Sequence, residues 1–214
     1  MMKKLFVREI NELVVLDKPL VSIRFTDPVA YRNFIFNLDD NLILSINDSQ
    51  VNFQTKSLII NNPLNIEIND KKTLTSLYKK LTYRISDNIR KQIVKVENDI
   101  FDLIDMISME SDCMLEYSDS FDIVKILQMY QVAIKEVKKE NFLEFILTYV
   151  KINFELNNYC IVLSFGLTQL LTGEEIIILK NELAINQICI VDFYFNNNNP
   201  QIDYLTIDNE WNKI

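Results

Sequence analysis

Short apolar runs separated by turn residues fill the first third of the chain. Runs rich in Val, Ile, Leu and Phe are typical of strands, and they lie at residues 5–10, 13–16, 20–25, 42–46, 51–53 and 57–60. The sequence Asn47-Asp48-Ser49 favours a turn, so residues 42–53 are predicted to form a hairpin. Asp27 followed by Pro28 predicts a helix over 28–38 with Asp27 as its N-cap.

From about residue 72 to residue 156 the apolar period becomes helical. Apolar residues recur at three- and four-residue steps, which predicts a long helix. They are Ile93, Val96, Ile100, Leu103 and Ile107. Two more helices are predicted over 121–134 and 140–156. No proline or glycine interrupts this stretch, as expected for a helical bundle.

Strand patterns return after residue 157. Residues 159–165 and 188–195 are nearly continuous apolar runs, typical of parallel strands that are buried on both faces. Thr172 and Glu175 form a capping-box pattern that opens a helix over 173–184, and a last strand is predicted over 202–207. Because strands lie on both sides of the helical stretch, we expect an α/β domain (1–71 and 157–214) with an inserted all-helical domain (72–156).

Two absences in the composition exclude many kinds of enzyme. The 214 residues contain no histidine and only two glycines, Gly166 and Gly173. The chain therefore lacks a His general base, an imidazole metal ligand and any glycine-rich phosphate loop. The turn after strand 20–25 has neither Gly nor Lys, and the charge of Asp27 would repel a phosphate. We expect no nucleotide binding there and no enzymatic activity.

Bulk charge and cysteine content suggest a soluble cytoplasmic protein. The net charge of −8 on its face argues against a nucleic-acid partner. Three cysteines, an odd number beside apolar runs, are expected to be buried and reduced, as in the cytoplasm. The uncharged run over 159–171 is too short to span a bilayer, so no membrane association is expected.

A reversal of charge inside the helical stretch is hidden by the whole-chain average. Residues 71–95 carry eight basic residues against one acidic residue, Asp87, a net charge of +7. Lysine-rich faces contact DNA phosphates without reading sequence, whereas the alternative is a solvated helix face. The eight candidate DNA-binding residues are Lys71, Lys72, Lys79, Lys80, Arg84, Arg90, Lys91 and Lys95.

The next segment, residues 96–124, carries nine acidic residues and no Lys or Arg. Five of them gather where one predicted helix ends and the next begins, and carboxylates there are the ligands that Ca²⁺ or Mg²⁺ takes. Their spacing matches no standard cation loop, so an acidic corner between helices is the alternative. The five candidate metal ligands are Glu110, Asp112, Glu116, Asp119 and Asp122.

The segment Glu110–Tyr117 is similar to an acidic stretch, ending in Leu-Glu-Tyr, of a known protein family. The chain resembles the small CRISPR-associated spacer-acquisition protein of subtype II-A systems, the short form of the Csn-two family. The resemblance covers most of the chain as a pattern of elements. It extends over 42–48, 57–61, 74–84 and the strands 159–165 and 188–195 that flank Leu171-Thr172-x-x-Glu175.

The resemblance implies a P-loop-NTPase-like sheet domain without the nucleotide motif, and an inserted helical domain. It also implies a homotetrameric ring that binds double-stranded DNA ends in a basic channel, takes up Ca²⁺ and has no catalytic activity. Its partners would be the integrase pair and the effector nuclease of the same acquisition system. By position, Glu110, Asp112 and Glu116 match the family's acids, Met114 stands where Asp is often found, and Lys79-Lys80 match family lysines.

The favoured function is therefore capture of DNA ends during acquisition of CRISPR spacers, with divalent cations ordering the helical domain. A carboxylate-metal nuclease built on Glu110, Asp112 and Glu116 is one alternative, although the chain offers no His as a base. A helical adaptor that binds only proteins is the other.

Overall fold

The computed structural model describes residues 2–8, 12–113, 115–117, 120–135, 137–195 and 204–207. The chain is a mixed α/β protein that separates into two compact units. Residues 1–68 and 136–214 form one, called the sheet unit below, and residues 69–135 form the other, called the helical unit. Each unit is described by itself.

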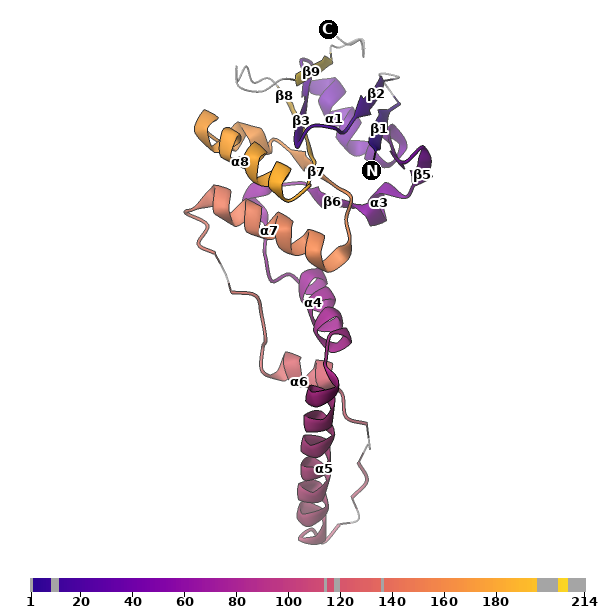
Figure 1. Cartoon of the computed structure of the whole chain (residues 1–214), viewed down its shortest axis with the longest axis vertical. Coiled ribbons are helices and arrows are strands. Elements are labelled where there is room, and N and C mark those ends of the chain that lie inside the picture. The colour runs from indigo at the N-terminus through magenta and orange to yellow at the C-terminus, as the bar shows by residue number, and fades with distance from the viewer. Residues whose placement is uncertain are drawn as a thin grey trace. The chain divides into compact units, whose positions relative to one another are not determined.

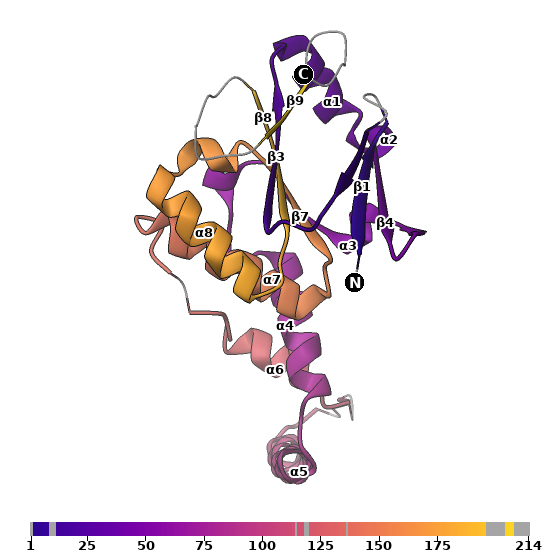
Figure 2. The ribbon, with the colours of Figure 1, turned by 45° about the horizontal axis from the view of Figure 1, so that its top comes forward.

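A five-stranded sheet, parallel throughout, is the centre of the sheet unit (Figure 2). Its order is β6 (Ser57–Ile60), β7 (Ile161–Phe165), β8 (Ile190–Phe195), β3 (Leu20–Phe25) and β9 (Tyr204–Ile207). Every residue of β7 is buried, which confirms the sequence prediction of a strand covered on both faces.

A second sheet of four antiparallel strands accompanies it. Its order is β2 (Glu12–Val15), β1 (Lys3–Val7), β4 (Leu42–Ile46) and β5 (Ser49–Val51). The predicted hairpin is confirmed, because β4 pairs with β5 across Asn47 and Asp48, which have φ values of 49° and 62°. This tight turn places β5 earlier than predicted, and Phe53 instead begins a short helix, α3 (Phe53–Lys56).

The main core lies between the two sheets and helix α1 (Pro28–Phe36). Phe34 of α1 is fully buried, with its ring centroid 5.1 Å from that of Phe25 and 4.8 Å from that of Phe193. The predicted N-cap is confirmed, since Asp27 accepts a hydrogen bond of 2.7 Å from the N–H of Ala30. α1 ends earlier than predicted, and a separate turn of helix, α2 (Leu38–Asn41), follows.

Helices α7 (Phe142–Asn157) and α8 (Gly173–Ile185) lie on the other side of the parallel sheet (Figure 2). The predicted capping box is present, because the N–H of Thr172 donates to Glu175 at 2.8 Å and the Thr172 hydroxyl accepts from the N–H of Glu175. Short 3₁₀ turns, η1 (Pro63–Asn65) and η2 (Leu167–Leu170), follow β6 and β7.

The grouping of α7 corrects the sequence analysis. The sequence pattern predicts one helical domain over 72–156, but α7 belongs to the sheet unit. The reason is its apolar face, since Ile146 and Val150 are buried in a helix that contacts β6 and α8. Periodicity predicts a helix but does not say which neighbour covers it.

The helical unit contains α4 (Lys71–Tyr83), α5 (Asp87–Met109) and α6 (Ile123–Met129) (Figure 1). Its two ends are tied together, because the Asn69 side chain both donates to and accepts from the backbone of Ile134 at 2.9 Å. The hydroxyl of Tyr78 donates to the carbonyl of Val132 at 2.9 Å. These bonds hold residues 132–134 in a non-helical path, so α6 is shorter than the predicted helix over 121–134.

None of the described helices combines the length and the apolar character that a bilayer crossing requires.

Candidate nucleic-acid interface

Two of the predicted DNA-binding residues lie on the exposed side of α4. Thr73 and Tyr78 are buried, and the helical period places Lys72 and Lys79, seven residues apart, on the opposite side of the helix. Lys71, Lys72 and Lys79 are exposed, whereas Lys80 is half-buried at the flank. The structure therefore brings Lys72 and Lys79 to one face, with Lys71 exposed at the start of the helix on one flank and Lys80 on the other.

The remaining basic residues follow on the next helix. Arg84 ends α4, and Arg90, Lys91 and Lys95 lie in the first half of α5; all four are exposed. Long, flexible Lys and Arg side chains at the surface can contact phosphate oxygens without a change in the backbone. This arrangement suits sequence-independent contact with a polyanion.

The acidic residues continue along the same helix and beyond it. Glu110 ends α5, and Asp122 caps α6 by accepting a hydrogen bond of 2.9 Å from the N–H of Val124. The hydroxyl of Tyr117 donates to Asp105, and this bond raises the pKa of Tyr117. The Tyr117 ring also stacks on Phe101, with centroids 6.2 Å apart. The segment after α5 is thus folded back along that helix.

Four of the five predicted metal ligands lie within the described residues, and these four do not come together as a site. Glu110, Asp112, Glu116 and Asp122 are exposed. No three acidic or cysteine residues of the described ranges lie close enough together to hold an ion. Asp119 and Met114 lie outside the described residues. The oxygen chemistry suits Ca²⁺, and the metal assignment stays a prediction.

The turn between β3 and α1 has the position of a phosphate loop but a different chemistry. Anions bind at a helix N-terminus through free N–H groups. Here the carboxylate of Asp27 accepts from the N–H of Ala30, and Pro28 offers no N–H at all. The negatively charged Asp27 side chain therefore occupies the position at which a phosphate would need hydrogen-bond donors.

A buried carboxylate on β8 was missed by the sequence analysis. Asp192 is fully buried and accepts hydrogen bonds from the Ser164 hydroxyl at 2.7 Å, the Leu167 N–H at 3.0 Å, and the N–H and hydroxyl of Thr168. Burial raises its pKa, against the opposing effect of these bonds. Through these hydrogen bonds the Asp192 side chain links β8 to β7 and to the 3₁₀ turn η2. The available signal was a single charge in the otherwise uncharged strand Ile190–Phe195.

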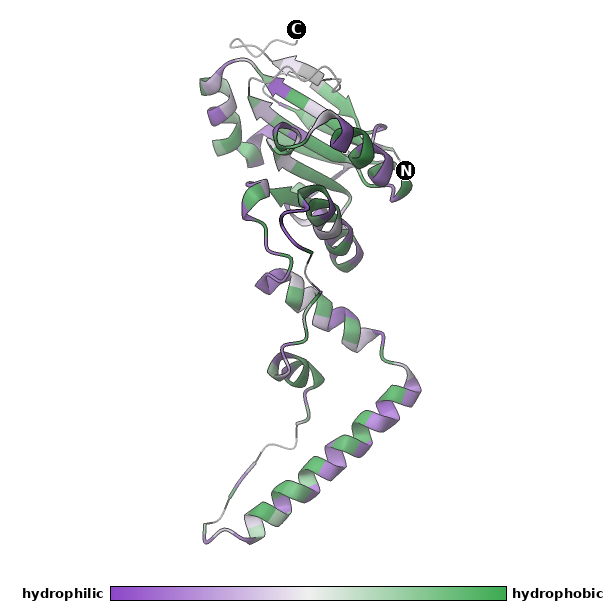
Figure 3. Ribbon diagram, turned by 90° about the vertical axis from the view of Figure 1, so that its left-hand side faces the viewer, coloured by the Kyte–Doolittle hydropathy of each residue, from purple (hydrophilic) through white to green (hydrophobic). Residues whose placement is uncertain are grey.

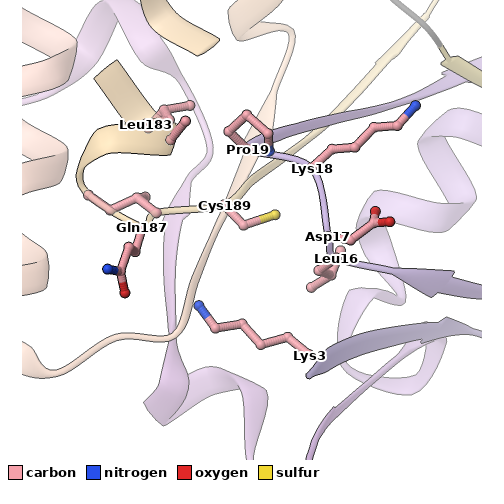
Figure 4. Close-up of a pocket in the computed structure, with 10 residues that line it drawn as sticks. Lys3, Leu16, Asp17, Lys18, Pro19, Leu183, Gln187 and Cys189 are labelled. Atoms are coloured by element: carbon pink, nitrogen blue, oxygen red, sulfur yellow. The ribbon is translucent and has the colours of Figure 1, made fainter. Parts of the chain in front are cut away.

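A cavity of about 350 Å³ opens at the edge of the sheet unit (Figure 4). Lys3 reaches into it and donates to the carbonyl of Cys160 at 2.7 Å. Cys189 lines the wall, and burial raises the pKa of its thiol to about 12, with a smaller opposing effect of Lys3. None of the predicted DNA-binding or metal-binding residues lines this cavity.

The three cysteines are free, but the expectation that all are buried holds fully only for Cys189. Cys113 is exposed, Cys160 is half-buried and Cys189 is buried. Cys113 follows α5 in an irregular segment rather than in an apolar run, so no core covers it.

Thiol labelling is expected to separate these residues. Because the thiolate is the reactive form, Cys113 should react with iodoacetamide at mildly alkaline pH while Cys189, with its raised pKa, remains unmodified. Peptide mass spectrometry over a time course measures both. Cys113→Ser should remove the fast phase, and equal rates at Cys113 and Cys189 would contradict the described burial.

Comparison with known proteins gives one family match. Residues 36–198, well over half of the chain, match the model of the family described as CRISPR-associated protein (Cas_Csn2). Among solved structures, the ADP conformation of MJ1267, an ATP-binding cassette of an ABC transporter, has a TM-score of 0.46 and 9% identity, covering 100% of this chain and 90% of that one. Likeness at that level supports no inference. Curated proteins give no match.

Proposed function

Because this chain belongs to the Csn2 (Csn-two) family of CRISPR-associated proteins, we propose that it binds the ends of double-stranded DNA during spacer acquisition. Binding is independent of sequence and involves no catalytic step. The observation that carries the proposal is the exposed basic surface of residues 71–95 on α4 and α5. Other proteins of the acquisition system, the integrase pair and the effector nuclease, are its proposed partners.

Assembly explains how an acidic protein binds a polyanion. The whole chain carries a net charge of −8, so a single copy repels DNA at long range. Four copies that turn their basic surfaces toward one channel present a concentrated positive field there and leave the acidic surfaces outside. We therefore propose a homotetrameric ring around the duplex.

Residue chemistry supports the proposal that no catalytic step takes place. The chain has no histidine to activate water or protonate a leaving group. At the strand–helix turn where phosphate chemistry would be placed in a nucleotide-binding fold, Asp27 caps the helix instead. We propose that the parallel sheet is related to that of P-loop NTPases, since β3 passes directly into α1, but that it serves as a scaffold.

Salt dependence tests the proposed mode of binding. Lysine–phosphate contacts release counterions, so the logarithm of the binding constant should fall linearly with the logarithm of salt concentration, with a slope of roughly several units. Fluorescence anisotropy with labelled duplexes of equal length and unrelated sequence measures this. Affinities that differ strongly between those duplexes at one salt concentration would contradict a phosphate-only interface.

Calcium is a separate part of the proposal. Carboxylates from the segment 110–122 are suitable oxygen ligands, and a bound cation would relieve repulsion among them. Because the described acids do not converge, no step of DNA binding is assigned to the ion. Ca²⁺ should raise the melting temperature, and excess EGTA should reverse the rise. Superimposable melting curves in Ca²⁺ and in EGTA would show that the segment is only an acidic corner.

A further inference from the structure

The cavity at the edge of the sheet unit has a buried floor and an exposed mouth (Figure 4). Leu16, Leu183 and Cys189 form the floor and are buried, whereas Ala184 and Gln187 at the mouth are exposed. The cavity volume of about 350 Å³ lies at the small end of the range of ligand pockets in proteins, about 300–1,000 Å³. A cavity of this size suits a single small molecule.

Backbone hydrogen bonds hold the walls of this cavity in place. The N–H of Leu16 donates to the carbonyl of Lys3 at 2.9 Å, and the N–H of Ile190 donates to the carbonyl of Pro19 at 2.9 Å. These bonds fasten the connection between β2 and β3 to the start of β1 on one side and to the start of β8 on the other. A ligand would therefore enter a preformed cavity, which lowers the entropic cost of binding.

The amino group of Lys3 points into the cavity (Figure 4). It donates one hydrogen bond, of 2.7 Å, to the carbonyl of Cys160, and an ammonium group has three N–H donors. In the part of the chain that the structure describes, no carboxylate forms an ion pair with Lys3. A positive charge and further N–H donors are therefore available to a ligand.

The surroundings of this charge are largely apolar. Figure 3 shows that the strands of the parallel sheet consist mainly of hydrophobic residues, and the cavity wall adds Pro19 and Ile188 to the apolar floor. A charge away from water is costly unless an opposite charge accepts its hydrogen bonds. An anion with an apolar body would satisfy Lys3 and also bury its own apolar surface.

The charges around the cavity favour a ligand with one negative charge over a ligand with two. The side chain of Lys18 points away from the cavity (Figure 4), and no arginine lines it. Asp17 also lines the cavity, and its charge contributes to the raised pKa of Cys189, so its field reaches the floor. A doubly charged phosphate would meet this repulsion with one inward-pointing lysine to offset it.

We propose that this cavity binds a small monocarboxylate with an apolar body. The carboxylate oxygens accept hydrogen bonds from the ammonium group of Lys3, and the apolar body packs against Leu16 and Leu183. The exposed Gln187 amide at the mouth can donate a further hydrogen bond. None of the lining residues belongs to the basic segment 71–95, so this site goes beyond the proposed DNA binding and does not depend on it.

Binding of hexanoate to the full-length protein tests the proposal, with hexanol and hexylamine as probes that share its apolar body. Ligand-observed NMR titrations measure the three dissociation constants. Hexanoate should bind saturably and at least roughly tenfold more tightly than hexanol, because hydrogen bonds between charged groups are stronger than those to neutral ones. Inorganic phosphate should not displace it. Absence of saturable binding, equal affinity for hexanol, tighter binding of hexylamine or displacement by phosphate would overturn the proposal.

Two matched substitutions locate the site. Lys3→Met keeps an unbranched side chain without the charge and should weaken hexanoate binding roughly tenfold, while hexanol binding stays unchanged. The control is Lys18→Met, which removes the same charge from a lysine that lines the cavity but points away from it (Figure 4). This control should bind hexanoate as the parent does. Equal losses in the two variants would show a general effect of net charge and would overturn the proposal.

A third substitution keeps the test decisive if Lys3→Met does not fold. Ala184→Phe places an aromatic ring at the exposed mouth of the cavity. It should abolish saturable binding of hexanoate while the circular dichroism spectrum stays that of the parent. Hexanoate binding that persists in folded Ala184→Phe would place the ligand elsewhere and would also overturn the proposal.

Discussion

A chain carrying Lys72→Glu and Lys79→Glu is expected to bind duplex DNA roughly two orders of magnitude more weakly than the parent at about 0.1 M salt. Both lysines are exposed on α4, on the side away from the buried Tyr78. Each reversal removes a proposed phosphate contact and adds a repulsive charge, and the proposed assembly would repeat the change in every copy. Fluorescence anisotropy against the same duplex, over a range of salt concentrations, measures the loss.

A matched pair of lysines in the sheet unit provides the control. Lys138→Glu with Lys139→Glu changes the charge equally, and both positions are exposed but lie outside the basic segment. This variant should retain most of its DNA affinity. Both variants should melt close to the parent, because substitutions of exposed residues usually change stability by only about 0.5 kcal/mol. Equal losses of affinity in the two variants would mean that only net charge matters and that α4 is not the interface.

Removing the buried carboxylate should have the largest effect on stability. Asp192→Ala leaves donors from Ser164, Leu167 and Thr168 without their acceptor in a fully buried position. Buried donors without a partner cost about 1–3 kcal/mol each, and four donors lose their acceptor, so a loss of at least roughly 4 kcal/mol and a large fall in melting temperature are expected. Calorimetry or urea unfolding measures it. The exposed Asp40→Ala is the control, and a similar small change in both variants would refute the anchoring role.

The raised pKa of Asp192 gives this site a pH signature. Below about pH 3 the carboxyl is largely neutral in both the folded and the unfolded chain. As pH rises, the unfolded chain releases this proton first, so the contribution of Asp192 to the free energy of unfolding falls until the raised pKa is passed. The melting-temperature gap between the parent and Asp192→Asn should therefore narrow from acid toward neutral pH. A gap that widens would contradict the shift.

Local signals in the sequence predicted local structure well. Asp27 with Pro28, and Thr172 with Glu175, each specify a helix start through hydrogen bonds within a few residues, and the structure contains both. The grouping of α7 could not be predicted in this way, because it depends on burial against strand β6, which is far away in sequence. α6 is shorter than its periodicity suggests because Asn69 and Tyr78 bond the backbone that follows it.

The candidate site was predictable only in part, because the sequence shows which charges are neighbours along the chain but not which side chains meet in space. Counting charges along the sequence locates the basic and acidic segments, but helix boundaries are needed to show that Lys79 faces outward while Lys80 lies at the flank. A metal site needs ligands to meet in space, and spacing along an irregular segment does not determine that. Asp192 gave a signal, a lone charge within an apolar strand, that pointed to an internal hydrogen-bond network.

The most direct test of the central claim compares a linear duplex with a covalently closed circle of the same sequence. We predict that the parent protein binds the linear form, with equal affinity for unrelated sequences, and does not bind the circle, because the proposed protein ring would load onto DNA only through an end. Competition by unlabelled linear DNA, by nicked circles and by closed circles measures the preference in one experiment. Closed circles that compete as well as linear DNA of equal mass would contradict end binding.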